Sequence, residues 1–184
     1  MKRNSLSFLF FLFLGIAATA QTEKGSWLVG GNFGLNTAKN NSQISISPSA
    51  GYFFLHNFAA GAQINFAYSK DVDIKRTNFG VGPFARYYFG TMNIRPFADG
   101  ELSYESTKSK IVGTGASSTV NGSSFFIGGG LAAFINRNVA IEGLAGYKSK
   151  SIKNGPNTGG INLRIGFQVY LSRDQVENMK SGRL

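Results

Sequence analysis

Apolar and polar residues alternate with a period of two from Gln21 onward, and helical spacing is almost absent. In the clearest stretch, near the end of the chain, one face of an extended strand carries Ile161, Leu163, Ile165, Phe167, Val169 and Leu171. The same alternation predicts eight strands, over residues 26–36, 43–54, 58–69, 77–89, 94–105, 124–135, 139–148 and 160–171.

The connections between these strands alternate in length. Short turns are expected at 55–57, 90–93 and 136–138, and longer polar links at 37–42, 70–76, 106–123 and 149–159. The longest link contains a Gly- and Ser-rich run at 113–118 and is expected to be a flexible loop. Short turns at one end and long links at the other predict an all-β fold, an eight-stranded antiparallel up-and-down transmembrane β-barrel.

The position of the aromatic residues indicates that the apolar face meets lipid. Two groups of rings lie near the two strand ends, on either side of small residues such as Ala62, Ala85 and Gly143. The rings beside the short turns are Trp27, Tyr52, Phe54, Phe58, Tyr87 and Phe89, and those beside the long links are Phe66, Tyr68, Phe79, Tyr104, Phe125 and Tyr147. Two such belts are expected at the two interfaces of a bilayer. A soluble barrel carrier, the main alternative, has no reason to place rings at both rims.

The start of the chain has the features of an export signal. A short basic start at Lys2 and Arg3 precedes an apolar run over residues 6–17 and a small-x-small motif at 18–20. We therefore expect a cleaved signal peptide over residues 1–20, a barrel over 21–171 and a short polar periplasmic tail over 172–184. The apolar run of about 12 residues falls short of the roughly 20 that a membrane-spanning helix needs.

With this pattern, the chain resembles the small outer-membrane β-barrel superfamily of OmpX-like proteins and OmpA-like transmembrane domains, a porin-like group. In that family the last strand ends in a polar-x-Gly-x-x-apolar-x-apolar assembly signal, which Arg164, Gly166, Val169 and Leu171 match. The chain departs from the family in continuing past this strand. The resemblance implies a Gram-negative outer membrane, surrounding lipid and lipopolysaccharide, and the barrel-assembly machinery as a partner during insertion.

The inward face of the predicted strands carries charges of both signs and a group of rings. A network of paired charges is expected from Arg86, Arg95, Asp99, Glu101, Glu142 and Arg164, because an unpaired charge in a low-dielectric interior is very costly. Near the short-turn end, an apolar plug is expected from Phe53, Phe84, Tyr88, Phe97 and Phe134. Since side chains can fill the interior of an eight-stranded barrel, a closed lumen is favoured over an ion-selective lining.

Positive charge gathers at the end with the long links. The net charge is +10, and the basic extracellular rim comprises Lys39, Lys70, Lys75, Arg76, Lys108, Lys110, Lys148, Lys150 and Lys153. The rim is expected either to bind lipopolysaccharide phosphates or to be merely a solvated surface. Nucleic acid is not an expected partner, because these residues lie outside the cell with no reading element.

Composition leaves little room for catalysis or metal binding. There is no Cys, and the one His, His56, lies in a short turn with no neighbouring Ser. The glycines at 128–130 continue into strand-like sequence rather than a helix, so no dinucleotide site is expected. Asp71 and Asp73 are too few for a calcium site. We expect no enzyme, cofactor or metal, and a structural, adhesive or partner-binding role at the cell surface, with a small passive channel as the alternative and a lipid A-modifying enzyme third.

Overall fold

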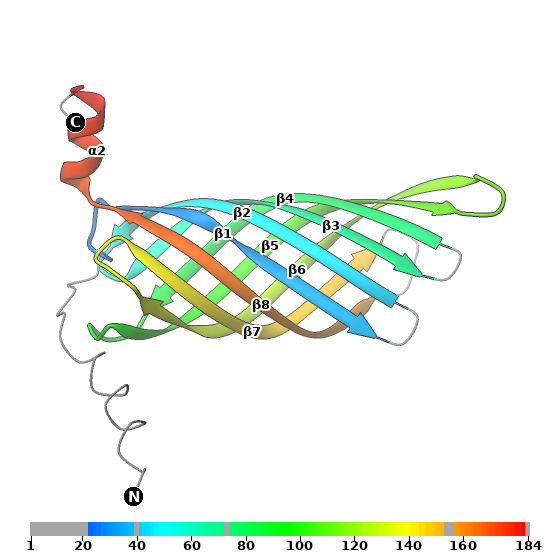
Figure 1. Ribbon diagram of the computed structural model, residues 1–184, viewed down its shortest axis with the longest axis horizontal. Helices are drawn as coiled ribbons and strands as arrows, with labels where there is room; N and C mark the ends of the chain where they lie inside the picture. The colour runs from blue at the N-terminus through cyan, green and yellow to red at the C-terminus, as the bar shows by residue number, and fades with distance from the viewer. Residues whose placement is uncertain (1–21, 39–40, 72–73, 153–156, 183–184) are drawn as a thin grey trace, which may run out of the picture.

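The computed structural model describes residues 22–38, 41–71, 74–152 and 157–182. Within these ranges eight antiparallel strands form a closed barrel in which each strand pairs with the next and β1 pairs with β8 (Figure 1). The strands are β1 Trp27–Ala38, β2 Asn41–Leu55, β3 Phe58–Asp71, β4 Ile74–Tyr88, β5 Ile94–Ile111, β6 Ser117–Phe134, β7 Val139–Ile152 and β8 Thr158–Leu171. The predicted up-and-down barrel is confirmed.

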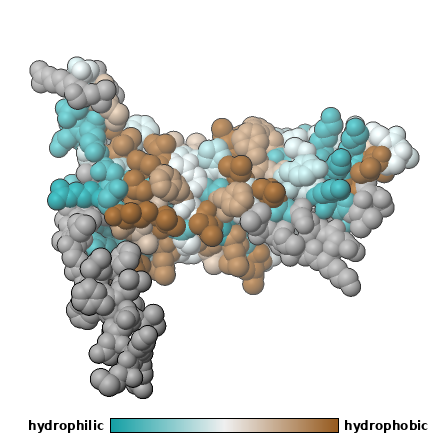
Figure 2. Space-filling view, in the orientation of Figure 1, coloured by the Kyte–Doolittle hydropathy of each residue, from teal (hydrophilic) through white to brown (hydrophobic). Residues whose placement is uncertain are grey.

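The alternation of the sequence places apolar side chains on the outside of the barrel. The exposed outward residues include aromatic rings from both predicted belts, such as Trp27, Tyr87, Phe66 and Tyr104. Brown apolar residues cover the middle of the barrel in Figure 2, between more polar ends. This inverted arrangement suits a surface that is solvated by lipid.

The expected loop over 106–123 is wrong. Strands β5 and β6 continue as a paired hairpin, with Thr107 opposite Val120 and Lys110 opposite Ser117, so that only residues 112–116 turn. Ser and Thr can complete a backbone ladder without packing a core, and Thr is itself a good strand former. Figure 1 shows this hairpin extending well beyond the other strands.

A short helix, α2 (Arg173–Lys180), follows β8 and was not expected from the sequence. A capping box starts it: the Ser172 hydroxyl accepts from the Gln175 backbone N–H, and the Gln175 side chain accepts from the Ser172 backbone N–H. The Asn138 side-chain amide donates to the Tyr170 carbonyl and to Gln175 Oε1, which ties the helix to the β6–β7 turn.

The segment before β1 packs against the end with the short turns. Thr22 and Ser26 are buried, and the Gly25 N–H donates to the Phe53 carbonyl at 2.9 Å. In the neighbouring β2–β3 turn, Asn57 has φ 63° and its N–H donates to the Thr22 carbonyl.

Several sequence predictions lie outside the described residues: the signal peptide over 1–20, Lys39, Asp73 and Lys153. Among the described residues, no helix is long and apolar enough to cross a membrane.

Candidate functional site in the barrel interior and at its outer mouth

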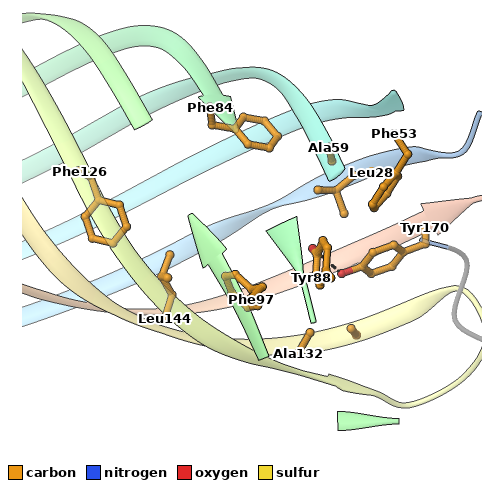
Figure 3. Close-up of a cluster of buried hydrophobic side chains, with 11 residues drawn as sticks. Leu28, Phe53, Ala59, Phe84, Tyr88, Phe97, Phe126, Ala132, Leu144 and Tyr170 are labelled. Carbon is orange, nitrogen blue, oxygen red and sulfur yellow. Dashed lines mark hydrogen bonds between the residues drawn. The ribbon is translucent and has the colours of Figure 1, made fainter. Parts of the chain in front are cut away.

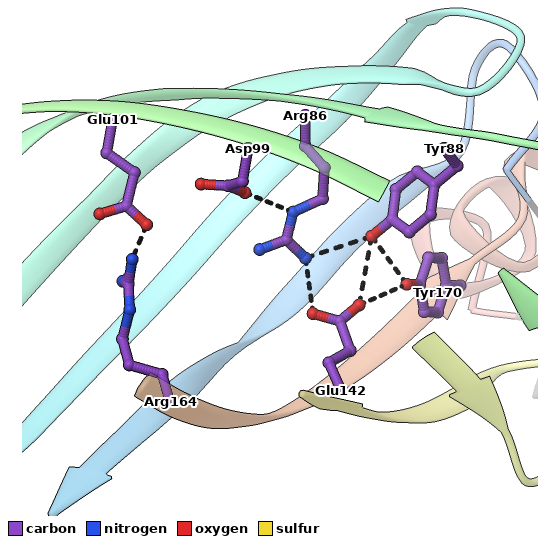
Figure 4. Close-up of polar contacts among 7 residues, drawn as sticks. All are labelled: Arg86, Tyr88, Asp99, Glu101, Glu142, Arg164 and Tyr170. Atoms are coloured by element: carbon purple, nitrogen blue, oxygen red, sulfur yellow. Dashed lines mark hydrogen bonds and ion pairs between the residues drawn. The ribbon is translucent and has the colours of Figure 1, made fainter. Parts of the chain in front are cut away.

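A buried ion network crosses the middle of the lumen. Arg86 donates from Nε to Asp99 Oδ2 and from Nη1 to Glu142 Oε2, both at 2.6 Å. Arg86 and Asp99 are register partners on β4 and β5, whereas Glu142 reaches them from β7 (Figure 4). All three side chains are almost fully excluded from solvent. One guanidinium thereby joins three strands and shares its single positive charge between two carboxylates.

Two tyrosine hydroxyls complete this network on its periplasmic side. The Tyr88 and Tyr170 hydroxyls lie 2.8 Å apart and both approach Glu142 Oε1, at 3.2 and 2.9 Å. Arg86 Nη1 also donates to the Tyr88 hydroxyl at 3.2 Å. Tyr88 therefore belongs to the polar network as well as to the ring cluster, which corrects its assignment to a purely apolar plug.

A second buried pair spans the lumen between β8 and β5. Arg164 Nη1 donates to Glu101 Oε1 at 2.8 Å, and its guanidinium lies 4.1 Å from the centre of the Phe126 ring. Phe126 fits because its neighbours are glycines: a Cβ added at Gly128 or Gly146 would lie 2.5 Å from the ring. Missing side chains on β6 and β7 thus make room for the ring that stacks on the cation.

The predicted plug residues lie together inside the barrel. Phe53, Phe84, Tyr88 and Phe97 are buried in one cluster (Figure 3). Phe134 is partly buried and packs against this cluster. The cluster also contains buried residues that were not predicted as part of the plug: Leu28, Ala59, Phe126, Ala132, Ala140, Leu144 and Tyr170. Tyr170 lies on the inward face of the predicted strand 160–171, so the alternation of that strand could have identified it as a member of the cluster.

Arg95 was wrongly placed in the ion network. Among its described contacts are the Thr22 hydroxyl at 2.5 Å and the Met92 and Thr91 carbonyls, and its guanidinium stacks 5.3 Å from the Phe134 ring centre. Arg95 instead binds the N-terminal segment and a short turn at the periplasmic end.

At the outer mouth, Glu105 gathers two lysines into the lumen. Glu105 accepts from Lys148 at 2.8 Å, from Lys150 at 3.0 Å and from the Ser124 hydroxyl at 2.6 Å. Glu105 and the two lysines border a mouth cavity of about 350 Å³ that Arg76 also lines. Lys148, Lys150 and Arg76, which were predicted as part of the basic extracellular rim, therefore lie at the outer mouth but face its inside, because each has the inward parity of its strand.

Four other predicted rim residues, Lys70, Lys75, Lys108 and Lys110, are exposed on β3, β4 and β5. Each has the same parity as the exposed rings Tyr68, Phe79 or Tyr104 of its own strand, so it faces outward. Lys75 is the register partner of both Lys70 and Lys110. Three lysines thus stand side by side on adjacent strands.

The four residues of the predicted assembly signal lie on β8. Arg164 and Gly166 face inward, where a Cβ at Gly166 would lie 2.5 Å from Asn32 Oδ1. Val169 and Leu171 are register partners of Val29 and Trp27 on β1. The motif therefore sits where the first and last strands meet.

The remaining residues weighed for chemistry are dispersed. His56 is exposed in the β2–β3 turn, Asp71 forms a 3.7 Å ion pair with Arg76, and residues 128–133 continue strand β6. Within the described ranges, no group of three or more His, Cys, Asp or Glu side chains is placed to hold a metal ion.

A closed eight-stranded barrel with a lipid-facing apolar exterior and a polar, charged interior defines a small transmembrane β-barrel protein. A family model described as the outer membrane protein beta-barrel domain matches residues 6–174. The chain belongs to this family, which places it in the Gram-negative outer membrane.

Solved structures show the same fold. Neisserial surface protein A is 16% identical with a TM-score of 0.62, covering 79% of this chain and 97% of its own. The N-terminal β-barrel domain of Pseudomonas aeruginosa OprF is 15% identical with a TM-score of 0.58, covering 80% and 98%. OprG from Pseudomonas aeruginosa is 10% identical with a TM-score of 0.52, covering 86% and 100%. No curated protein matches the sequence.

Proposed function

We propose that this protein is a closed outer-membrane barrel with a structural, adhesive or partner-binding role at the cell surface, and that its outward lysines bind lipopolysaccharide. The observation that carries the closed lumen is the buried network of Arg86, Asp99 and Glu142 with two tyrosine hydroxyls. On the periplasmic side of this network, Phe53 is fully buried and its ring centre lies 6.2 Å from that of Tyr170. No catalytic step is part of the proposal.

An open ion path is disfavoured because the interior side chains are bound to one another. An open path would have to separate Arg86 from its two carboxylates. That separation would leave three buried charges unpaired, each at a cost of several kcal/mol. A filled interior is also the ordinary state of an eight-stranded barrel. The small passive channel is therefore the second candidate.

Planar-bilayer recording of the purified protein tests the closed lumen. We expect no steady ionic current from the wild type. The variant Arg86→Ala/Asp99→Ala/Glu142→Ala, combined with Phe53→Ala and Tyr170→Ala, removes the spanning network and two plug rings and serves as the open control, with measurable current expected. Steady, reproducible current steps from the wild type would overturn the closed lumen in favour of the channel.

The lysine row supports the lipopolysaccharide part. Like charges directly opposite each other on neighbouring strands are unfavourable, yet Lys70, Lys75 and Lys110 occupy such positions with side chains about 5 Å apart at their bases. Lys70 lies two residues beyond the outer-belt ring Tyr68, which is roughly 7 Å along a strand. This height corresponds to the phosphate level of the outer leaflet, where an anion would offset the repulsion.

Charge reversal at the row tests this part. We expect Lys75→Glu/Lys110→Glu to lower the lipid A that co-purifies with the barrel by at least about tenfold, since each cation near an anionic surface contributes about 1 kcal/mol. Lipid A is measured by mass spectrometry against the barrel concentration. The control, Arg137→Glu/Asn136→Asp/Thr91→Asp, makes the same change in net charge at exposed turn residues of the periplasmic end and should retain lipid A. Equal retention by both variants would contradict the proposal.

A further inference from the structure

A pocket of about 570 Å³ lies at the periplasmic end, between the first turn of α2 and the start of the barrel. Lys24, Gly25, Trp27 and Tyr52 line it from the barrel, and Arg173, Val176 and Glu177 line it from the helix. None of these residues takes part in the interior network or in the lysine row. The pocket therefore needs a separate explanation.

The pocket lies at a membrane interface. Trp27 and Tyr52 belong to the inner aromatic belt, and their rings meet edge to face at 5.5 Å. Trp and Tyr gather at the level of lipid headgroups, where one part of the ring is apolar and the other wet. In Figure 1, α2 leaves β8 at a steep angle to the barrel axis, so the helix runs beside the membrane surface.

The polar groups of the pocket have the charges of a zwitterionic headgroup. Two cations, Lys24 and Arg173, line the pocket together with one carboxylate, Glu177. Arg173 Nε donates to Glu177 Oε1 at 2.9 Å, a bond that does not use the two terminal guanidinium nitrogens. A guanidinium and an ammonium bind phosphate oxygens through charge-assisted hydrogen bonds, and a carboxylate accepts from an ammonium in the same way.

Local geometry fixes the backbone on both sides of the pocket, while the Arg173 and Glu177 side chains stay exposed, at 74% and 60%. Gly25 has φ 96°, which only glycine adopts readily, and a Cβ there would lie 3.6 Å from Arg173 Cδ and 3.9 Å from the Tyr52 hydroxyl. The arginine stem therefore lies against the chain just before β1. The capping box at Ser172 and the bond from Asn138 to Gln175 fix the first turn of α2.

We propose that this pocket binds the headgroup of a phosphatidylethanolamine-type phospholipid from the periplasmic leaflet. The phosphodiester lies between Lys24 and Arg173, the primary ammonium reaches Glu177, and the lipid chains descend along Trp27. The helix thus holds a phospholipid against the periplasmic end of the barrel. This inference rests on the membrane location alone and is independent of the closed lumen and the lysine row.

Trp27 is the single tryptophan of the chain, so its fluorescence reports on this pocket directly. The delipidated full-length barrel in a non-ionic detergent is titrated with dihexanoyl phosphatidylethanolamine. We expect a saturable change in Trp27 emission. Dihexanoyl phosphatidylcholine, whose quaternary ammonium cannot donate a hydrogen bond, should bind several-fold more weakly, and dihexanoylglycerol, which lacks the phosphate, should give no saturable change.

Variants separate the site from general lipid partition. Lys24→Ala/Arg173→Ala should weaken phosphatidylethanolamine binding at least tenfold, and Glu177→Gln should remove the preference over phosphatidylcholine. Arg137→Ala, a matched exposed arginine in the β6–β7 turn at the same end, should bind as the wild type does. The proposal is overturned if dihexanoylglycerol reproduces the wild-type curve, if Arg137→Ala is weakened as much as the double variant, or if the two phospholipids bind equally to the wild type.

Discussion

At the scale of single residues, Arg86 shows how much one buried side chain can organise. Its guanidinium bonds Asp99, Glu142 and the Tyr88 hydroxyl, which come from three different strands. Removing one partner of a buried ion pair is far more costly than replacing the whole set by neutral groups. The barrel should therefore respond very differently to the two kinds of change.

Arg86→Met is expected to destabilise the barrel by about 3–5 kcal/mol, because Asp99 and Glu142 would lose their shared cation. The measurement is reversible urea unfolding in lipid vesicles, with the folded fraction read from the heat-modifiable gel shift. The control is Arg137→Met, at an exposed arginine of the β6–β7 turn, which should leave the urea midpoint unchanged within error.

Neutralising the carboxylates at the same time should restore much of the lost stability. The triple variant Arg86→Met/Asp99→Asn/Glu142→Gln is therefore expected to unfold at higher urea concentration than Arg86→Met alone. If the single variant matches the wild type, the network does not contribute in the way described.

Strand parity predicts which residues face the lumen, and only between neighbouring strands does it also predict which ones meet. Arg86 and Asp99 were expected to face each other because hairpin neighbours can be counted along the sequence. Arg164 and Glu101 lie on β8 and β5, which are not neighbours, so their 2.8 Å bond depends on the width and tilt of the closed barrel. Parity alone already gives Lys148 an inward direction. Lys150, two residues further along β7, has the same parity, although its place in a predicted long link assigned it to the rim.

At the scale of elements, the two departures from expectation have a common cause. The β5–β6 hairpin and α2 both lie beyond the membrane, where the apolar alternation that identifies a strand is no longer required. The hairpin is held by its backbone hydrogen bonds, and α2 is held by a capping box. Such local hydrogen bonds are harder to predict from the sequence than the apolar alternation of a lipid-facing strand.

The outer part of the hairpin should be dispensable for folding. Replacing residues 109–118 by Asn-Gly would join Lys108 and Thr119, which are register partners, through a two-residue turn. We expect the urea midpoint and the heat-modifiable shift to stay within error of the wild type, because the removed pairs lie above the outer belt. Failure of this variant to fold would show that the ladder nucleates the barrel. Shortening the hairpin below Glu105 provides the contrast, since it removes the mouth ion pairs.

At the scale of the whole molecule, the barrel has two chemically distinct ends. The outer end carries exposed lysines and a mouth cavity lined by charges, and the other carries the short turns, the N-terminal segment and α2. Short turns face the periplasm and longer connections face outward in this architecture.

The absence of cysteine from the chain makes this orientation directly testable. Gly113→Cys, at the tip of the β5–β6 hairpin, should react with a membrane-impermeant maleimide on intact cells. Thr91→Cys, in the β4–β5 turn, should react only after the outer membrane is permeabilised. The reverse labelling pattern would place the lysine row in the periplasm and remove the basis for lipopolysaccharide binding.

The seam between the first and last strands has a mechanical consequence. In the described residues, β1 and β8 pair only from Trp27 to Phe33 against Leu171 to Ile165, whereas β5 and β6 pair along almost their full lengths. Opening a cylinder requires breaking one complete ladder, and the shortest ladder offers the lowest cost. The barrel is therefore expected to open first between its two terminal strands, β1 and β8, and to unroll from there into an open sheet.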